Sequence, residues 1–118
     1  MVKNDRKMAE VIRWQIGDAP LGGAPLAAAI GNNVIKVYGE TDPSKIPWKK
    51  HDIDIVCESS GMFTNTESCN MHLVAGAKKV VISAPPKDDT PMYVMGVNHE
   101  DINTNDKVVS NASCTTNC

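Results

Sequence analysis

The fold is decided by the stretch Asp52-Ile53-Asp54-Ile55-Val56-Cys57-Glu58-Ser59-Ser60-Gly61. Apolar residues alternate and then run continuously up to Glu58, which is typical of a strand buried in a sheet. The serines and the glycine that follow predict a turn. A helix is expected next, because Thr64 and Glu67 have the spacing of a capping box and Gly76 provides a stop. We expect this helix to run to about Ala75.

Four further apolar runs surround this strand–turn–helix unit. They predict strands at residues 34–38, 79–83, 93–97 and 107–110. Strands that alternate with helices or long crossovers indicate a parallel sheet. The sequence therefore predicts an α/β fold with a mostly parallel sheet.

The first third of the chain carries weaker patterns. Residues 7–16 have apolar side chains at roughly helical spacing, which predicts a short helix. Residues 17–33 are rich in Gly, Pro and Ala and are expected to form a loop. No Gly-x-Gly-x-x-Gly occurs anywhere in the sequence.

Composition narrows the classes of function. The 118 residues are enough for one domain, and a net charge of −2 argues against a nucleic-acid binder. No apolar run reaches membrane-spanning length. The N-terminus lacks a signal-peptide apolar region, so the four cysteines are interpreted as thiols in a reducing compartment. We therefore expect a cytoplasmic protein that contacts neither nucleic acid nor membrane.

The candidate chemistry lies in the last nine residues, Ser110-Asn111-Ala112-Ser113-Cys114-Thr115-Thr116-Asn117-Cys118. A strand followed by a polar turn would deliver Cys114 to a helix N-terminus, where unpaired backbone N–H groups favour a thiolate. The same N–H groups, with the hydroxyls of Ser113 and Thr115, can hold an oxyanion or a phosphate. The alternatives are an inert buried thiol and ordinary helix capping. Cys118 is interpreted as a thiol without a catalytic role.

Five motifs follow one another along residues 33–118. They are Asp42-Pro43-Ser44-Lys45-Ile46-Pro47-Trp48, Glu58-Ser59-Ser60-Gly61-Met62-Phe63-Thr64, Gly76-Ala77-Lys78-Lys79-Val80-Val81-Ile82-Ser83-Ala84-Pro85, Val94-Met95-Gly96-Val97-Asn98-His99 and Asn111-Ala112-Ser113-Cys114-Thr115-Thr116-Asn117-Cys118. Together they resemble phosphorylating glyceraldehyde-3-phosphate dehydrogenase.

The resemblance implies that residues 1–118 are an incomplete NAD-binding domain with a partial, Rossmann-like, doubly wound sheet. They would be its second half, ending at the active-site cysteine motif. The family carries its glycine-rich fingerprint in the first strand–turn–helix, and the resemblance implies that these first units are missing. Without them, strand 52–58 is expected to expose an edge and strand 34–38 to lie apart from the sheet. Residues 1–32 are divergent from the family and residues 33–118 are family-like.

The resemblance also implies roles for individual residues. Those that would contact the cofactor NAD are Ser60, Gly61, Phe63, Ser83 and Ala84. Cys114 would attack the aldehyde of glyceraldehyde 3-phosphate, and inorganic phosphate would release the resulting thioester. Ser113 and Thr115 would contact substrate or phosphate. The parent enzyme of glycolysis is expected to be a homotetramer, and the isolated chain is expected to be inactive.

Two alternatives stay open at this point. An erythrose-4-phosphate dehydrogenase of the same superfamily would carry nearly the same motifs. A non-catalytic interaction or redox-sensing fragment would carry a reactive thiol without turnover. No spacing suggests a metal site, and the three histidines His51, His72 and His99 are interpreted as surface or packing residues.

Overall fold

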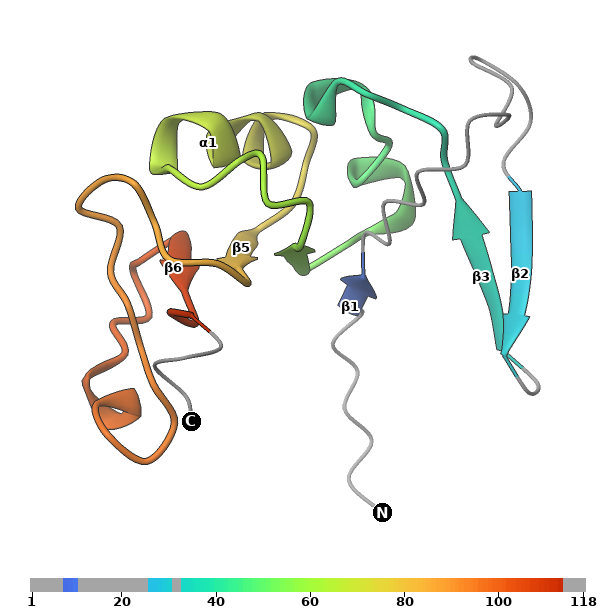
Figure 1. Ribbon diagram of the computed structural model, residues 1–118. Coiled ribbons are helices and arrows are strands. Elements are labelled where there is room, and N and C mark those ends of the chain that lie inside the picture. The colour runs from blue at the N-terminus through green and yellow to red at the C-terminus, as the bar shows by residue number, and fades with distance from the viewer. Residues whose placement is uncertain (1–7, 11–25, 31–32, 114–118) are drawn as a thin grey trace.

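A four-stranded parallel sheet is the centre of the fold in this computed structural model, which describes residues 8–10, 26–30 and 33–113 (Figure 1). Its order is β1-β4-β5-β6, with β1 at Met8–Glu10, β4 at Ile55–Glu58, β5 at Lys79–Ile82 and β6 at Val108–Ser110. A separate antiparallel pair consists of β2 (Leu26–Ile30) and β3 (Asn33–Val37). The helix α1 spans Thr66–Val74, and the 3₁₀ helices η1, η2 and η3 span Pro43–Lys45, Lys49–His51 and His99–Asp101. The fold is a partial Rossmann-like α/β fold.

One face of the sheet is buried. The register of β4, β5 and β6 places apolar residues of this face opposite one another. Val56 lies opposite Val80, and Val80 lies opposite Val108, so three valines form a row across the strands. All three are buried in the hydrophobic core. Cys69 of α1 is fully buried in the same core, and α1 covers this face in Figure 1. Residues two positions further along each strand share this face, because side chains alternate along a strand.

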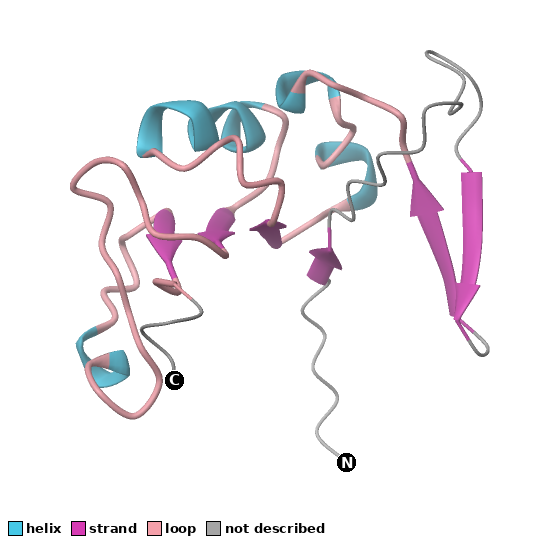
Figure 2. Ribbon diagram, viewed as in Figure 1, coloured by secondary structure: helices cyan, strands magenta, loops and turns pink. Residues whose placement is uncertain are grey.

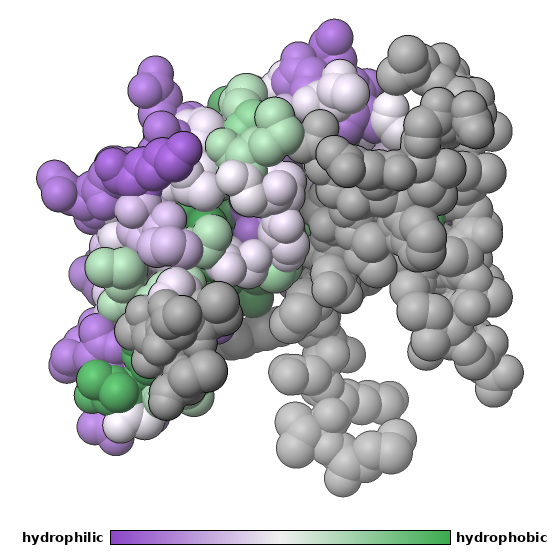
Figure 3. Space-filling model, viewed as in Figure 1, coloured by the Kyte–Doolittle hydropathy of each residue, from purple (hydrophilic) through white to green (hydrophobic). Residues whose placement is uncertain are grey.

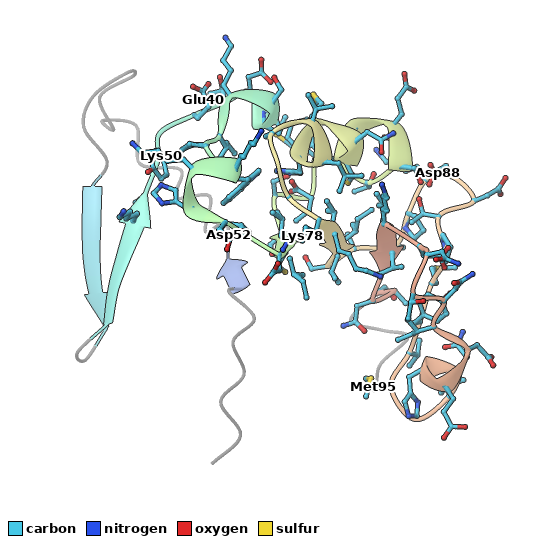
Figure 4. All side chains as sticks on the ribbon, turned by 180° about the vertical axis from the view of Figure 1, so that it is seen from behind. Glu40, Lys50, Asp52, Lys78, Asp88 and Met95 are labelled. Carbon is cyan, nitrogen blue, oxygen red and sulfur yellow. The ribbon has the colours of Figure 1, made fainter. Side chains whose placement is uncertain are left out.

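Two side chains outside the helix accept hydrogen bonds from the N–H groups of the first turn of α1. The side chain of Asn65 accepts a hydrogen bond from the N–H of Ser68 over 2.8 Å, and Asp88 accepts one from the N–H of Thr66 over 2.8 Å. Figure 4 shows Asp88 beside this end of the helix. The N-cap is therefore Asn65 and not Thr64, so the prediction of a capping box formed by Thr64 and Glu67 is wrong. The predicted stop is correct: Ala75 is the C-cap, and Gly76 follows with a φ of 114°.

Two predictions for the N-terminal third are wrong where the structure describes it. Residues 8–10, predicted as part of a helix, form β1, and residues 26–30, predicted as loop, form β2. A helix with such weak apolar spacing is less stable than a paired strand here, because β1 forms parallel hydrogen bonds with the open edge of β4. The edge that strand 52–58 was expected to expose is therefore covered. The expected separation of strand 34–38 is correct, and β2 is its partner, with Ile30 opposite Asn33.

The C-terminal half follows the predictions with one exception. Strands β4, β5 and β6 lie within the predicted ranges. The predicted strand at 93–97 is wrong: the structure has only an isolated bridge between Met92 and Ser110, and residues 95–98 form a turn. Gly96, with a φ of 84°, lies in that turn and interrupts the extended backbone. Figure 2 shows the result, a long loop with η3 between β5 and β6.

The same loop carries much of the exposed apolar surface. Met95 and Val97 are 72% and 80% exposed, and Met92 and Ile102 nearby are also exposed. The strongly hydrophobic surface at the lower left of Figure 3 lies over this part of the molecule. Among the residues that the structure describes, no helix is both long and apolar enough to cross a membrane.

Candidate functional site

The carboxyl ends of three parallel strands meet in one row. Glu58 of β4 lies opposite Ile82 of β5, and Ile82 lies opposite Ser110 of β6. The chain leaves each strand directly after this row, so three polar segments start side by side at one edge of the sheet. In open α/β sheets, ligands bind outside the carboxyl ends of the strands. This edge is therefore the candidate site.

The segment after β4 is a turn built on the side chain of Glu58. The N–H of Ser60 donates to Oε1 of Glu58 over 2.8 Å, and the N–H of Met62 donates to Oγ of Ser60 over 3.2 Å. Gly61, between them in the chain, has a φ of 73°, which suits glycine. A Cβ at Gly61 would meet no atom within 4 Å, so the turn faces open space where a ligand can approach the backbone.

The segment after β5 is tied to both neighbouring strands. The N–H of Ser83 donates to the carbonyl oxygen of Glu58 over 3.0 Å, and the carbonyl oxygen of Ala84 accepts from Oγ of Ser110 over 2.7 Å. Ser83 is exposed at the edge, and Ala84 is half-buried against the core. Both residues that were predicted here for cofactor contact therefore lie beside the Ser60 turn.

The segment after β6 is held by a serine that is 1% exposed. Oγ of Ser110 donates to Ala84 and accepts a hydrogen bond from the N–H of Ala112 over 3.0 Å. Ala112 is buried and has a φ of 60°, a backbone conformation that is uncommon for a residue with a side chain. Ser110 thus fixes the strained backbone just before Ser113, which is half-buried. The predicted nucleophile Cys114 and its neighbour Thr115 lie outside the described residues.

A buried polar chain under the site was not predicted from the sequence. Oε2 of Glu58 lies 2.7 Å from Nε2 of His72, and Nδ1 of His72 accepts from Nε1 of Trp48 over 3.0 Å. Glu58 and His72 are 4% and 1% exposed. The sequence predicted His72 to be a surface or packing residue, and its burial in the core agrees with a packing residue. The available signal was Glu58 itself, a charged residue that ends an apolar strand.

The carboxylate of Glu58 is stabilised in its charged form. Burial disfavours the charge, but the hydrogen bonds from His72 and Ser60 outweigh burial and lower the pKa of Glu58 below its ordinary value. Glu58 is thus an ionised group with both oxygens used within the protein. It can orient the turn, and its burial makes it a poor acid or base for a substrate.

The edge brings together four of the five residues predicted for the cofactor. Ser60 and Gly61 form one turn, and Ser83 and Ala84 lie beside it. The fifth, Phe63, is half-buried and packs against the hydrophobic core. An open glycine turn next to small polar residues fits a nucleotide, because backbone and hydroxyl groups can approach it without crowding. Over residues 8–10, 26–30 and 33–113, no group of three or more His, Cys, Asp or Glu side chains could hold a metal ion.

Most of the chain is similar in sequence to known dehydrogenases. Residues 24–66, which contain the Ser60 turn, match the family model described as "Glyceraldehyde 3-phosphate dehydrogenase, NAD binding domain". The chain is 57% identical over 90 residues to a glyceraldehyde-3-phosphate dehydrogenase of Zymomonas mobilis, and this match covers 75% of the chain and 27% of the relative. It is 55% identical over 89 residues to glyceraldehyde-3-phosphate dehydrogenase 1 of Schizosaccharomyces pombe, covering 75% and 26%.

A longer match includes part of the N-terminal third. A glyceraldehyde-3-phosphate dehydrogenase of Cryphonectria parasitica is 49% identical over 102 residues, which are 86% of the chain and 29% of the relative. The chain belongs to the glyceraldehyde-3-phosphate dehydrogenase family. Ser60 and Gly61 lie within the region that matches the NAD-binding-domain model. The chain spans about a quarter of the length of these curated dehydrogenases.

Proposed function

We propose that this chain is the part of a phosphorylating glyceraldehyde-3-phosphate dehydrogenase that contacts NAD and supplies the nucleophile Cys114. The observation that carries the proposal is the row Glu58–Ile82–Ser110 at the carboxyl edge of the sheet. The Ser60 turn and the segment that precedes Cys114 in the sequence both start from this row, at one edge of the sheet.

The proposed reaction begins at the thiol of Cys114. Its thiolate sulfur bonds to the aldehyde carbon of glyceraldehyde 3-phosphate, and the aldehyde oxygen takes up a proton to give a thiohemiacetal. Bound NAD would supply the acceptor for the hydride that leaves this carbon; the hydroxyl proton is lost to solvent, and a thioester on Cys114 remains. An oxygen of inorganic phosphate then attacks the thioester carbon, the acyl phosphate departs, and the thiolate is restored. Backbone N–H groups, with Ser113 and Thr115, stabilise the oxyanion or phosphate in these steps.

The proposal also covers the substrates, the location and the oligomeric state of the parent enzyme. The relatives named above are glyceraldehyde-3-phosphate dehydrogenases, which supports glyceraldehyde 3-phosphate and phosphate as substrates. We propose that the protein is located in the cytoplasm and that the parent enzyme is a homotetramer. Residues 1–118 alone are expected to be inactive, because the sequence lacks the glycine-rich turn that would hold the pyrophosphate at a helix N-terminus.

A chimera tests the proposal. Residues 33–118 of this chain replace the matching segment of the Zymomonas mobilis relative, and NADH production from glyceraldehyde 3-phosphate and phosphate is measured. Cys114→Ser should reduce the rate on the order of a thousandfold or more, because a serine hydroxyl is a far weaker nucleophile. The control Cys118→Ser should keep most of the activity. Retention of most activity by Cys114→Ser would refute the assignment.

A further inference from the structure

The carboxylate of Glu58 lies between the sheet and α1, where both its oxygens have partners. Oε2 faces His72 at 2.7 Å, and Oε1 accepts from the N–H of Ser60 at 2.8 Å. A charge so completely removed from solvent is retained only where it is fully hydrogen-bonded. The two bonds run in opposite directions, one into the core and one into the turn that faces open space. Glu58 therefore connects the core to the candidate site.

The protonation of His72 follows from Trp48. An indole N–H can only donate, so Nδ1 of His72 must be an acceptor and carries no proton. In a neutral imidazole the other nitrogen then carries the proton, and Nε2–H donates to Glu58. The pair is a charge-assisted hydrogen bond from imidazole to carboxylate. The pair fixes the carboxylate plane, and the remaining oxygen is directed at Ser60.

We propose that Glu58 is a positioning residue for the cofactor-binding turn, with His72 holding its other carboxylate oxygen. Two segments depend on Glu58, because its side chain holds the N–H of Ser60 and its carbonyl oxygen holds the N–H of Ser83. The proposal rests on the proposed function, in which both segments contact NAD.

The substitution Glu58→Gln separates the two bonds of this residue. Glutamine keeps the shape but has only one oxygen, which can serve either His72 or Ser60. His72 is 1% exposed, while Ser60 is half-buried, so water can replace the partner of Ser60 but not that of His72. The oxygen should therefore go to His72, and the N–H of Ser60 should be released.

Amide hydrogen exchange of residues 1–118, followed by NMR, measures this release. Exchange at Ser60 should accelerate at least tenfold in Glu58→Gln, while Ser83, bound to the backbone of the same residue, should change less than threefold. Trp48→Phe is the matched control: it removes a neighbouring buried bond but leaves both carboxylate oxygens, so Ser60 should stay protected. Equal acceleration of Ser60 and Ser83, or no acceleration at Ser60, would overturn the proposal.

A second measurement links the turn to the cofactor. In the chimera with the Zymomonas mobilis relative described above, Glu58→Gln should weaken the apparent affinity for NAD at least threefold. Equal affinity in the two chimeras would overturn the role of Glu58 toward NAD. A chimera that binds no NAD, with the exchange result intact, would instead refute the proposed function and leave the positioning of the turn by Glu58 established.

Discussion

Gly76 lies directly against the backbone of Lys49. A Cβ at Gly76 would come within 2.7 Å of the Lys49 nitrogen, and the N–H of Lys49 donates to the carbonyl oxygen of Ala75 over 3.1 Å. The end of α1 is thereby joined to η2, which starts at Lys49. This contact requires a residue without a side chain and with a positive φ, and Gly76, with a φ of 114°, satisfies both requirements.

The substitution Gly76→Ala should destabilise the fold by about 2–4 kcal/mol, because backbone strain and the clash with Lys49 add. The matched control is Gly96→Ala. Gly96 also has a positive φ, 84°, but a Cβ there would meet nothing within 4 Å, so only about 1 kcal/mol of strain is expected. Urea unfolding measures both values. Equal losses would show that the contact with Lys49 does not matter.

Replacing Asn65 by alanine should cost about 1 kcal/mol of unfolding free energy, because the N–H of Ser68 loses its acceptor at the start of α1. Glu67→Ala should change stability by less than about 0.5 kcal/mol, since the helix start is capped by Asn65. Thermal unfolding of the two variants compares them. A larger loss in Glu67→Ala would restore the capping-box interpretation.

The thiol of Cys69 should resist alkylation in the native protein. Burial raises the pKa of Cys69 to about 11, so about one molecule in ten thousand carries its thiolate at pH 7. Cys57 is half-buried rather than fully buried and should react at least tenfold faster. With Cys114 and Cys118 replaced by serine, iodoacetamide labelling followed by mass spectrometry gives the two rates. Both thiols should react equally in urea, and equal rates in native buffer would contradict the burial of Cys69.

The pKa of Glu58 predicts an acid-sensitive contribution to stability. Its folded pKa lies below 4.5, its ordinary value, because hydrogen bonds from His72 and Ser60 outweigh burial. The unfolded chain then binds more protons than the folded one between the two values, so stability is present above pH 4.5 and is lost as the pH falls through the folded pKa.

The difference in unfolding free energy between the wild type and Glu58→Gln isolates this contribution. It should be constant from neutral pH down to about 5 and should shrink below pH 4.5, because protonated glutamic acid resembles glutamine. The comparison cancels the effects of Asp42 and Asp88, whose pKa values are also lowered, by hydrogen bonds from Ser44 and Thr90 respectively. A difference independent of pH would contradict an ionised Glu58 in the fold.

Strong local signals predicted the central elements correctly. Continuous apolar runs marked β4 and β5, the end of α1 followed from Gly76, and parallel order followed from alternation of element types. Weak local signals failed. The three residues of β1 and the Leu-Ala-Ala-Ala-Ile run of β2 have no strand pattern of their own. They become strands through hydrogen bonds to β4 and β3, which lie far along the chain or across a turn.

The sequence by itself determined which residues would stand at the edge of the sheet. Serines, a glycine and an alanine follow three apolar strands, and strand direction alone brings Ser60, Ser83 and Ser113 to one side. Only the tertiary structure decided how that edge is held. Trp48, Glu58 and His72 are separated by at least ten residues in the chain, and no local pattern relates them. They meet because α1 packs on the sheet, where a buried carboxylate must find partners for both its oxygens.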